Sequence, residues 1–183
     1  MKKLVVVLGD LATGKSTFAK IIAEKYDLEL ISKDDIKEIL GDQIGFKDRE
    51  ENIKLSKTSY SLLYFVLEKA CSKNIDVILE ANFHEEQLKS IEGVARKYEY
   101  EILKIVINGD PSVLYKRYMN RLINEHRNPV HASIPFSSCE DFKEYTLSNR
   151  EKNLLGTKIE IDATSFDYQS DSKILKQIES FLR

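Results

Sequence analysis

The residues best suited to chemistry form one stretch near the start of the chain, from Gly9 to Thr17. A glycine is followed by four residues and then by Gly14-Lys15-Ser16, between an apolar run and a helix-forming segment. This spacing between strand and helix is typical of a phosphate-binding P-loop. Glycines let the backbone approach a ligand closely, and successive N–H groups at a helix start bind anions. The stretch therefore predicts a nucleoside triphosphate site.

Two residues of this loop have distinct expected roles. Lys15 is expected to reach the β- and γ-phosphates and to act in catalysis, while Ser16 offers a hydroxyl to Mg²⁺. ATP and Mg²⁺ are thus the predicted cosubstrate and cofactor. The residues expected to contact ATP are Gly9, Asp10, Leu11, Ala12, Thr13, Gly14, Lys15, Ser16 and Thr17.

Two carboxylates, those of Asp34 and Glu80, lie at or just after the ends of segments that are expected to be strands. Asp34 could accept the proton of an acceptor hydroxyl and orient that hydroxyl towards the γ-phosphate. Alternatively, Asp34 and Asp35 could serve solely to cap a helix whose N-cap is Ser32, because negative charge is favourable at the start of a helix. Glu80 ends the apolar run 75–80 and could hold Mg²⁺ or its water, or contact a substrate.

Arginines near residue 120 could neutralise the charge of a triphosphate. Arg117 and Arg121 lie four residues apart, hence on one helical face, and Arg127 follows in a loop. Such arginines can close over phosphates during transfer, although a solvated basic face is the alternative. Residues 162–166 could line an adenine pocket, but a plain strand-to-loop transition explains them nearly as well.

The elements that must position these residues alternate between strand and helix. Strands are expected at about 4–8, 28–31, 75–80, 102–107 and 158–162, and helices at about 15–26, 32–40, 49–72, 85–98, from 110, 139–154 and 171–182. Gly41 and Gly45 are expected in a loop, and 125–138 as an irregular, mobile segment. Continuously apolar strands separated by helices indicate a parallel sheet that binds ligands at the carboxyl edge of its strands.

Composition indicates one soluble globular domain spanning residues 1–183. The chain is 42% hydrophobic and 32% charged, and its net charge of −2 provides no broad basic field for nucleic acid. Its two cysteines lack metal or redox spacing, and no run resembles a signal peptide or approaches the length of a membrane span. We therefore expect a cytoplasmic protein with no membrane partner.

In this order, the segments 9–17, 32–37, 77–83 and 117–121 resemble the small P-loop kinases related to the polynucleotide 5′-kinase, zeta-toxin and chloramphenicol phosphotransferase families. The resemblance implies an α/β P-loop NTPase fold with a five-stranded parallel sheet ordered 2-3-1-4-5, flanked by helices, and a helical lid at about 117–138. It also implies that Asp34 is the general base and that Arg117 and Arg121 contact the phosphates. Lys37 departs from a frequent family arginine and lacks its bidentate fork.

These features predict an ATP-dependent phosphotransferase that acts on a hydroxyl of a small molecule. The alternatives are a nucleic-acid 5′-hydroxyl kinase, which the net charge does not favour, and a nucleotide-dependent ATPase or switch without a small-molecule acceptor. Residues that could line an acceptor pocket are Lys57, Tyr60, Asn82, Phe83 and His84.

Overall fold

The computed structural model describes residues 2–125, 127–131, 136–150 and 156–183. Its centre is an all-parallel, five-stranded sheet in the order β2-β3-β1-β4-β5, which confirms the predicted fold class and strand order. The strands are β1 (Lys2–Gly9), β2 (Glu29–Ser32), β3 (Val77–Glu80), β4 (Tyr100–Asn108) and β5 (Thr157–Asp162).

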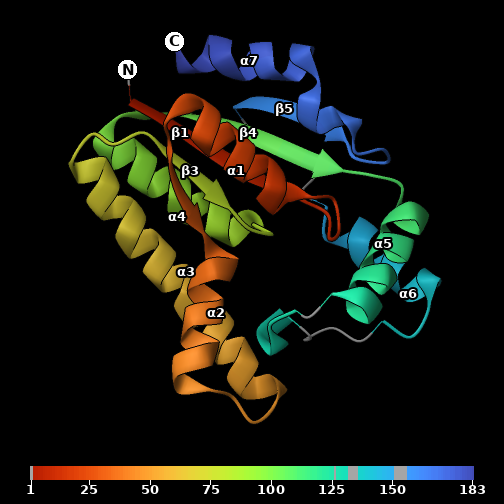
Figure 1. The fold of residues 1–183 in the computed structure, drawn as a ribbon. Coiled ribbons are helices and arrows are strands. Elements are labelled where there is room, and N and C mark those ends of the chain that lie inside the picture. The colour runs from red at the N-terminus through yellow and green to blue at the C-terminus, as the bar shows by residue number, and fades with distance from the viewer. Residues whose placement is uncertain (1, 126, 132–135, 151–155) are drawn as a thin grey trace.

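Helices cover both faces of this sheet, with α3 and α4 on one face and α1 and α7 on the other (Figure 1). A further pair, α5 and α6, lies beyond the carboxyl ends of the strands. The helices are α1 (Lys15–Tyr26), α2 (Lys33–Ile44), α3 (Arg49–Ser72), α4 (Glu85–Tyr98), α5 (Pro111–Asn124), α6 (Cys139–Ser148) and α7 (Ser172–Leu182), with short 3-10 turns η1 (Pro129–His131) and η2 (Asp167–Ser170).

The apolar run in β1 is continuous because both faces of the strand are buried. Side chains alternate across a strand, so Val5 and Val7 pack with α1 and α7, whereas Leu4, Val6 and Leu8 pack with α3 and α4. All five side chains are at most 2% exposed. Burial on both faces places β1 in the middle of the core and fixes the loop that follows it.

The strand register brings the chemical residues to one edge of the sheet. Ser32 pairs with Glu80, Glu80 pairs with Val7, and Gly9 pairs with Ile107. The loop after β1, the start of α2, the end of β3 and the loop after β4 therefore meet at the carboxyl edge, where parallel sheets bind ligands.

The prediction of a loop at Gly41 is wrong, because α2 continues through this glycine to Ile44. A Cβ atom at position 41 would lie 2.2 Å from Cγ1 of Val130. Gly41 therefore serves close packing within a helix and not a turn. Gly45 does follow the helix, with a φ of +75°.

The segment predicted as irregular, 125–138, contains the η1 turn, and Val130 in that turn is fully buried. In Figure 1 this turn lies beside the lower part of α2, across from α5. The predicted helix 139–154 is described as α6 up to Ser148, and positions 151–155 lie outside the described residues. In the part of the chain that the structure describes, no helix has the length and apolar character to cross a membrane.

Candidate functional site

The loop after β1 adopts a conformation that requires glycine at both ends. Gly9 has a φ of +134°, and a Cβ atom there would lie 2.0 Å from the Ile107 carbonyl oxygen. Gly14 has a φ of +90° and directly precedes α1, and Ala12 also has a positive φ of 59°. The backbone therefore wraps tightly in front of the amino end of α1, as a phosphate-binding loop must.

Lys15 lies inside this loop, close to carboxylates. Its Nζ donates to the Asp10 carbonyl oxygen at 2.5 Å, and the Thr13 hydroxyl donates to the same oxygen at 3.0 Å. Burial lowers the pKa of Lys15, whereas the charges of Glu80, Asp34 and Asp10 act to raise it. The structure thus brings the predicted catalytic lysine together with both predicted carboxylates.

Glu80 ends β3 with a side chain that is almost fully buried, since the residue is 3% exposed. Its Oε2 accepts a hydrogen bond from Ser32 Oγ at 3.3 Å. Burial raises the pKa of Glu80, while Lys15 and hydrogen bonds from Ser16 and Ser32 oppose that shift. A buried carboxylate beside the exposed Ser16 hydroxyl is a set of hard oxygen donors that suits Mg²⁺.

Asp34, the second residue of α2, is surrounded by positive charge. Lys33 Nζ lies 3.1 Å from Asp34 Oδ1, and His131 Nδ1 lies 3.9 Å from Oδ2. Burial acts to raise the pKa of Asp34, but Lys33, His131 and Lys15 together lower it. These neighbours therefore favour the carboxylate form of Asp34 over the protonated form.

The predicted N-cap of α2 is confirmed. The Ser32 side chain accepts a hydrogen bond from the Asp35 backbone N–H at 3.4 Å. Asp35 itself is exposed, whereas the Asp34 carboxylate faces Lys33 and His131. The two neighbouring acids thus have different surroundings, since Asp35 is exposed and Asp34 lies beside a lysine and a histidine.

The three predicted arginines occupy two places. Arg117 donates to the carbonyl oxygens of Ala163 (2.5 Å) and Thr164 (2.7 Å), and its guanidinium carbon lies 3.9 Å from the centre of the Phe166 ring. Arg117, which the resemblance implies is a phosphate contact, therefore has its guanidinium bonded to the loop predicted to line an adenine pocket.

Arg121 and Arg127 interact electrostatically with Lys15 and Asp34, respectively. Arg121, which pairs with Glu125 at 3.1 Å, acts to lower the pKa of Lys15. Burial and Arg121 lower the pKa of Arg127, while Asp34 raises it. Arg127 is thus electrostatically coupled to both Arg121 and Asp34.

Lys37 anchors the η1 turn to α2. Its Nζ donates to the Val130 carbonyl oxygen at 2.8 Å, and Asn52 Nδ2 donates to the same oxygen at 3.2 Å. The next residue, His131, lies 2.6 Å from Glu38 Oε1 through its Nε2 atom, and its other ring nitrogen faces Asp34. Lys37 therefore holds the turn that brings a histidine to the predicted base.

This anchor predicts a pH dependence of stability. Burial lowers the pKa of Lys37 to about 8, from an ordinary value of 10.5. Between these values the folded protein binds fewer protons than the unfolded chain, so Lys37 makes the free energy of unfolding rise with pH. In urea unfolding, Lys37→Met should lack this rise. The free energy of unfolding of the variant, relative to that of wild type, should therefore be lower at about pH 10 than at about pH 7. Lys47→Met, at an exposed lysine, is the control; a pH-independent difference for Lys37→Met would contradict the prediction.

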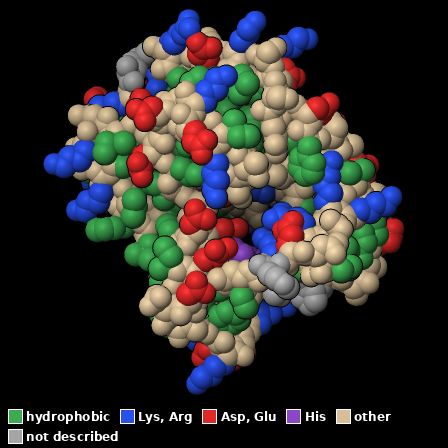
Figure 2. All heavy atoms as spheres, viewed as in Figure 1, with side chains coloured by type: hydrophobic (Ala, Val, Ile, Leu, Met, Phe, Trp, Pro, Cys, Tyr) green, Lys and Arg blue, Asp and Glu red, His purple; other side chains and the backbone are tan. Residues whose placement is uncertain are grey.

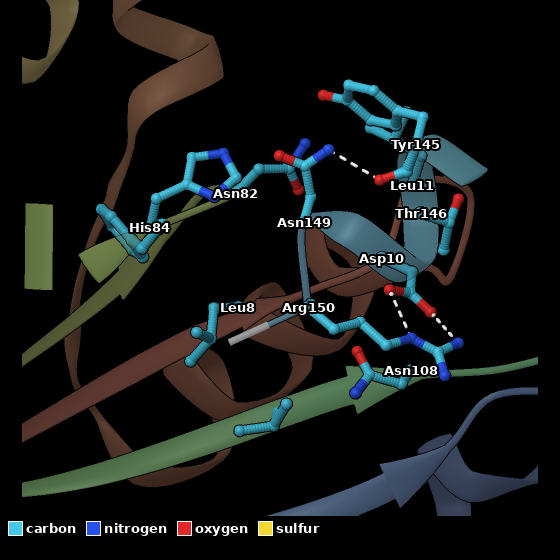
Figure 3. Close-up of a pocket in the computed structure, with 13 residues that line it drawn as sticks. Leu8, Asp10, Leu11, Asn82, His84, Asn108, Tyr145, Thr146, Asn149 and Arg150 are labelled. Carbon is cyan, nitrogen blue, oxygen red and sulfur yellow. Dashed lines mark hydrogen bonds and ion pairs between the residues drawn. The ribbon is translucent and has the colours of Figure 1, made fainter. Parts of the chain in front are cut away.

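A pocket lies between the P-loop and α6 at the same edge of the sheet (Figure 3). Arg150, just after α6, donates from Nε to Asp10 Oδ1 (3.2 Å) and from Nη2 to Oδ2 (2.7 Å). The partners are 140 residues apart in sequence, and no local motif marks the pair. The residues that line the pocket are Leu8, Gly9, Asp10, Leu11, Asn82, Phe83, His84, Val106, Asn108, Tyr145, Thr146, Asn149 and Arg150.

A chain of contacts links this pocket to Asp34. Lys33, which pairs with Asp34, lies 5.7 Å from the centre of the Tyr60 ring, and the Tyr60 hydroxyl donates to the Asn82 carbonyl oxygen at 2.9 Å. Three of the residues predicted to line an acceptor pocket, Asn82, Phe83 and His84, line the pocket described above. Tyr60 contacts Asn82, and Lys57 is exposed on α3. Figure 2 shows a hollow in this face with acidic side chains on one side and basic ones on the other.

Several solved structures are similar to the whole chain. A candidate kinase from Chloroflexus aurantiacus has 24% sequence identity and a TM-score of 0.81, covering 98% of this chain and 95% of its own. A gluconokinase from Sinorhizobium meliloti has 14% identity and a TM-score of 0.59, with the same two coverages. The Mycobacterium tuberculosis APS kinase CysC, solved with AMPPNP and APS, has 16% identity, a TM-score of 0.58 and 97% coverage of both chains.

The sequence matches one protein-family model. An AAA domain model (AAA_33) covers residues 4–144, which run from β1 into α6 and include the P-loop, Asp34 and Glu80. No protein with a curated description matches the chain. The chain belongs to this AAA domain family and has the fold of the P-loop kinases.

Proposed function

We propose that the chain is an ATP-dependent phosphotransferase that moves the γ-phosphate of ATP to a hydroxyl of a small molecule. One observation carries this proposal: Asp34, at the start of α2, lies at the same sheet edge as Lys15 and Glu80, and contacts through Lys33 and Tyr60 link it to a separate pocket. Binding a nucleotide would require only the P-loop. The pocket and a carboxylate at the same edge of the sheet add what a transfer reaction needs.

In this proposal the loop 9–17 cradles the phosphates, while Arg117 and the loop 162–166 flank the adenine. Ser16 and Glu80 would hold Mg²⁺, which when bound neutralises charge shared between the β- and γ-phosphates. Lys15 reaches the same phosphates from within the loop. Arg121 and Arg127 stabilise the charge that develops during transfer.

The transfer itself is an in-line displacement. The acceptor hydroxyl oxygen forms a bond to the γ-phosphorus while the bond from that phosphorus to the β–γ bridging oxygen breaks, and ADP leaves with the bond's electron pair. In this proposal Asp34 takes the hydroxyl proton. His131 and Lys33 hold the Asp34 carboxylate in position.

The acceptor would occupy the pocket between the P-loop and α6. The names of two similar proteins, a gluconokinase and an APS kinase, support a small-molecule acceptor, as does the absence of a broad basic field from a chain of net charge −2. The same proposal includes kinship with the polynucleotide 5′-kinase, zeta-toxin and chloramphenicol phosphotransferase families. The order of the motifs along the chain supports this kinship.

Acceptor-dependent release of ADP tests this function. With Mg²⁺ and ATP present, pools of nucleosides, sugars and other alcohols should raise the rate of ADP release by at least about tenfold over water alone, because water is not positioned by the pocket. Lys15→Met should abolish both rates. A rate that no pool changes, small-molecule or 5′-hydroxyl oligonucleotide, would instead favour an ATPase or switch.

A further inference from the structure

The pocket beside the P-loop has a floor that is apolar and buried. Leu8 and Val106, from neighbouring strands, and Phe83, from the loop after β3, are 2%, 7% and 3% exposed. Leu11 of the P-loop adds a fourth apolar side chain (Figure 3). A ligand in this pocket therefore rests one face on hydrocarbon.

The charges in the pocket wall cancel each other. Asp10 and Arg150 form a two-bond ion pair, Asp10 Oδ2 also accepts from the Gly109 N–H at 3.1 Å, and Arg150 Nη2 donates to the Gly109 carbonyl oxygen at 2.6 Å. Both charged groups are thus already satisfied within the protein. An anionic ligand group would lose its water here without gaining an uncompensated cation, which is unfavourable.

Two buried polar atoms of the pocket residues have no hydrogen-bond partner within the described part of the chain. They are the side-chain oxygens Asn82 Oδ1 and Thr146 Oγ1. Thr146, on the helix that roofs the pocket, is 3% exposed, so its hydroxyl is shielded from bulk water. Leaving such atoms unpaired costs stability, and a ligand that donates hydrogen bonds to them after a rotation of the two side chains would remove that cost.

We propose that the pocket binds an uncharged acceptor, with one apolar face and hydroxyl or N–H groups that donate to Asn82 Oδ1 and Thr146 Oγ1, in preference to a phosphorylated or carboxylated one. This inference rests on the proposed kinase function, because it identifies the pocket as the acceptor site. An uncharged acceptor would distinguish this chain from kinases that bind an anionic acceptor through a cationic side chain that is not already paired. Arg121 and Arg127, which act electrostatically on Lys15 and Asp34, are not among the residues that line this pocket.

Direct binding measurements test the proposal independently of catalysis. Ligand-observed NMR at millimolar concentration would compare neutral compounds with their anionic analogues: adenosine with AMP, glucose with gluconate and glucose 6-phosphate, and N-acetylethanolamine with N-acetylglycine. At least one neutral member should bind at least about tenfold more tightly than its anionic partner. Tighter binding of the anionic members, or binding of none, would overturn the proposal.

The variant Thr146→Val provides the second measurement, with Thr58→Val as its matched control. Thr58 is an exposed helical threonine whose hydroxyl already donates to the Lys54 carbonyl oxygen at 2.9 Å. Because Thr146→Val removes an unpaired polar atom, its Tm should stay equal or rise, while affinity for the neutral binder falls about tenfold. A lower Tm with unchanged affinity would show that the hydroxyl is structural and would overturn the proposal.

The two proposals fail in different ways. If no pool changed the rate of ADP release, but a neutral compound bound wild type and lost affinity in Thr146→Val, the kinase function would be refuted and the pocket chemistry supported. A carboxylated or phosphorylated compound that becomes phosphorylated would support the kinase and refute the proposed acceptor class.

Discussion

Replacing Asp34 with asparagine is expected to lower the rate of phosphate transfer by roughly 10²–10⁴-fold, with little change in ATP affinity. The amide keeps the size of the side chain but cannot take the acceptor's proton. The contacts of Asp34 are with Lys33 and His131, whereas the P-loop holds its own conformation through Asp10, Thr13 and Lys15. Single-turnover transfer and ATP titration measure the two quantities separately.

The adjacent Asp35→Asn is the matched control for this experiment. Asp35 is exposed, and its contribution to the N-cap of α2 comes from its backbone N–H, which the substitution retains. Transfer by Asp35→Asn should stay within about threefold of wild type, since exposed substitutions away from the site have small effects. If Asp34→Asn lost ATP affinity in proportion to activity, Asp34 would serve the nucleotide or metal and not the acceptor.

Gly41→Ala is expected to cost about 1–3 kcal/mol of stability by overpacking, although alanine is normally the better helix residue. The added methyl would lie 2.2 Å from Val130 Cγ1, and the stiff, β-branched valine cannot move aside without displacing the η1 turn. Displacing the turn would break the Lys37 and Asn52 hydrogen bonds and withdraw His131 from Asp34. We therefore also expect transfer to slow by roughly tenfold or more.

The double variant Gly41→Ala/Val130→Ala is the control that makes this prediction specific. Val130 Cβ would lie 3.6 Å from the new methyl, an ordinary contact, so removing Cγ1 restores the space. The double variant should recover most of the lost activity, and a double-mutant cycle should give a coupling of about 1 kcal/mol or more. Additive effects of the two substitutions on unfolding and transfer would contradict a direct contact between Gly41 and Val130.

The sequence was sufficient to predict the sheet because its signals are local. The apolar run of β1 followed by the loop from Gly9 to Thr17 identifies a strand, loop and helix, and the alternation of elements implies parallel strands. The strand order came from a family resemblance carried by such local motifs. Ser32 as an N-cap and Asp110-Pro111 at the start of α5 were likewise predictable from nearest neighbours.

Tertiary contacts explain what the sequence did not reveal. Gly41 resembles a turn residue until Val130, 89 positions later, is seen to occupy the space a side chain would need. Arg150 pairs with Asp10 across 140 residues, and Lys37 donates to a carbonyl 93 residues away. Within the irregular segment 125–138, Val130 is the one described apolar residue that is fully buried, which local polarity does not indicate. Such contacts depend on how α2, α5 and α6 approach one another.

The destination of a labelled γ-phosphate tests the central claim most directly. Wild-type protein would be incubated with γ-labelled ATP, Mg²⁺ and pools of neutral alcohols, and labelled products would be separated from inorganic phosphate. We predict a labelled organic phosphate that forms with wild type and falls to background with Asp34→Asn. Label that appears only as inorganic phosphate, at a rate unchanged by every pool, would contradict the assignment as a phosphotransferase.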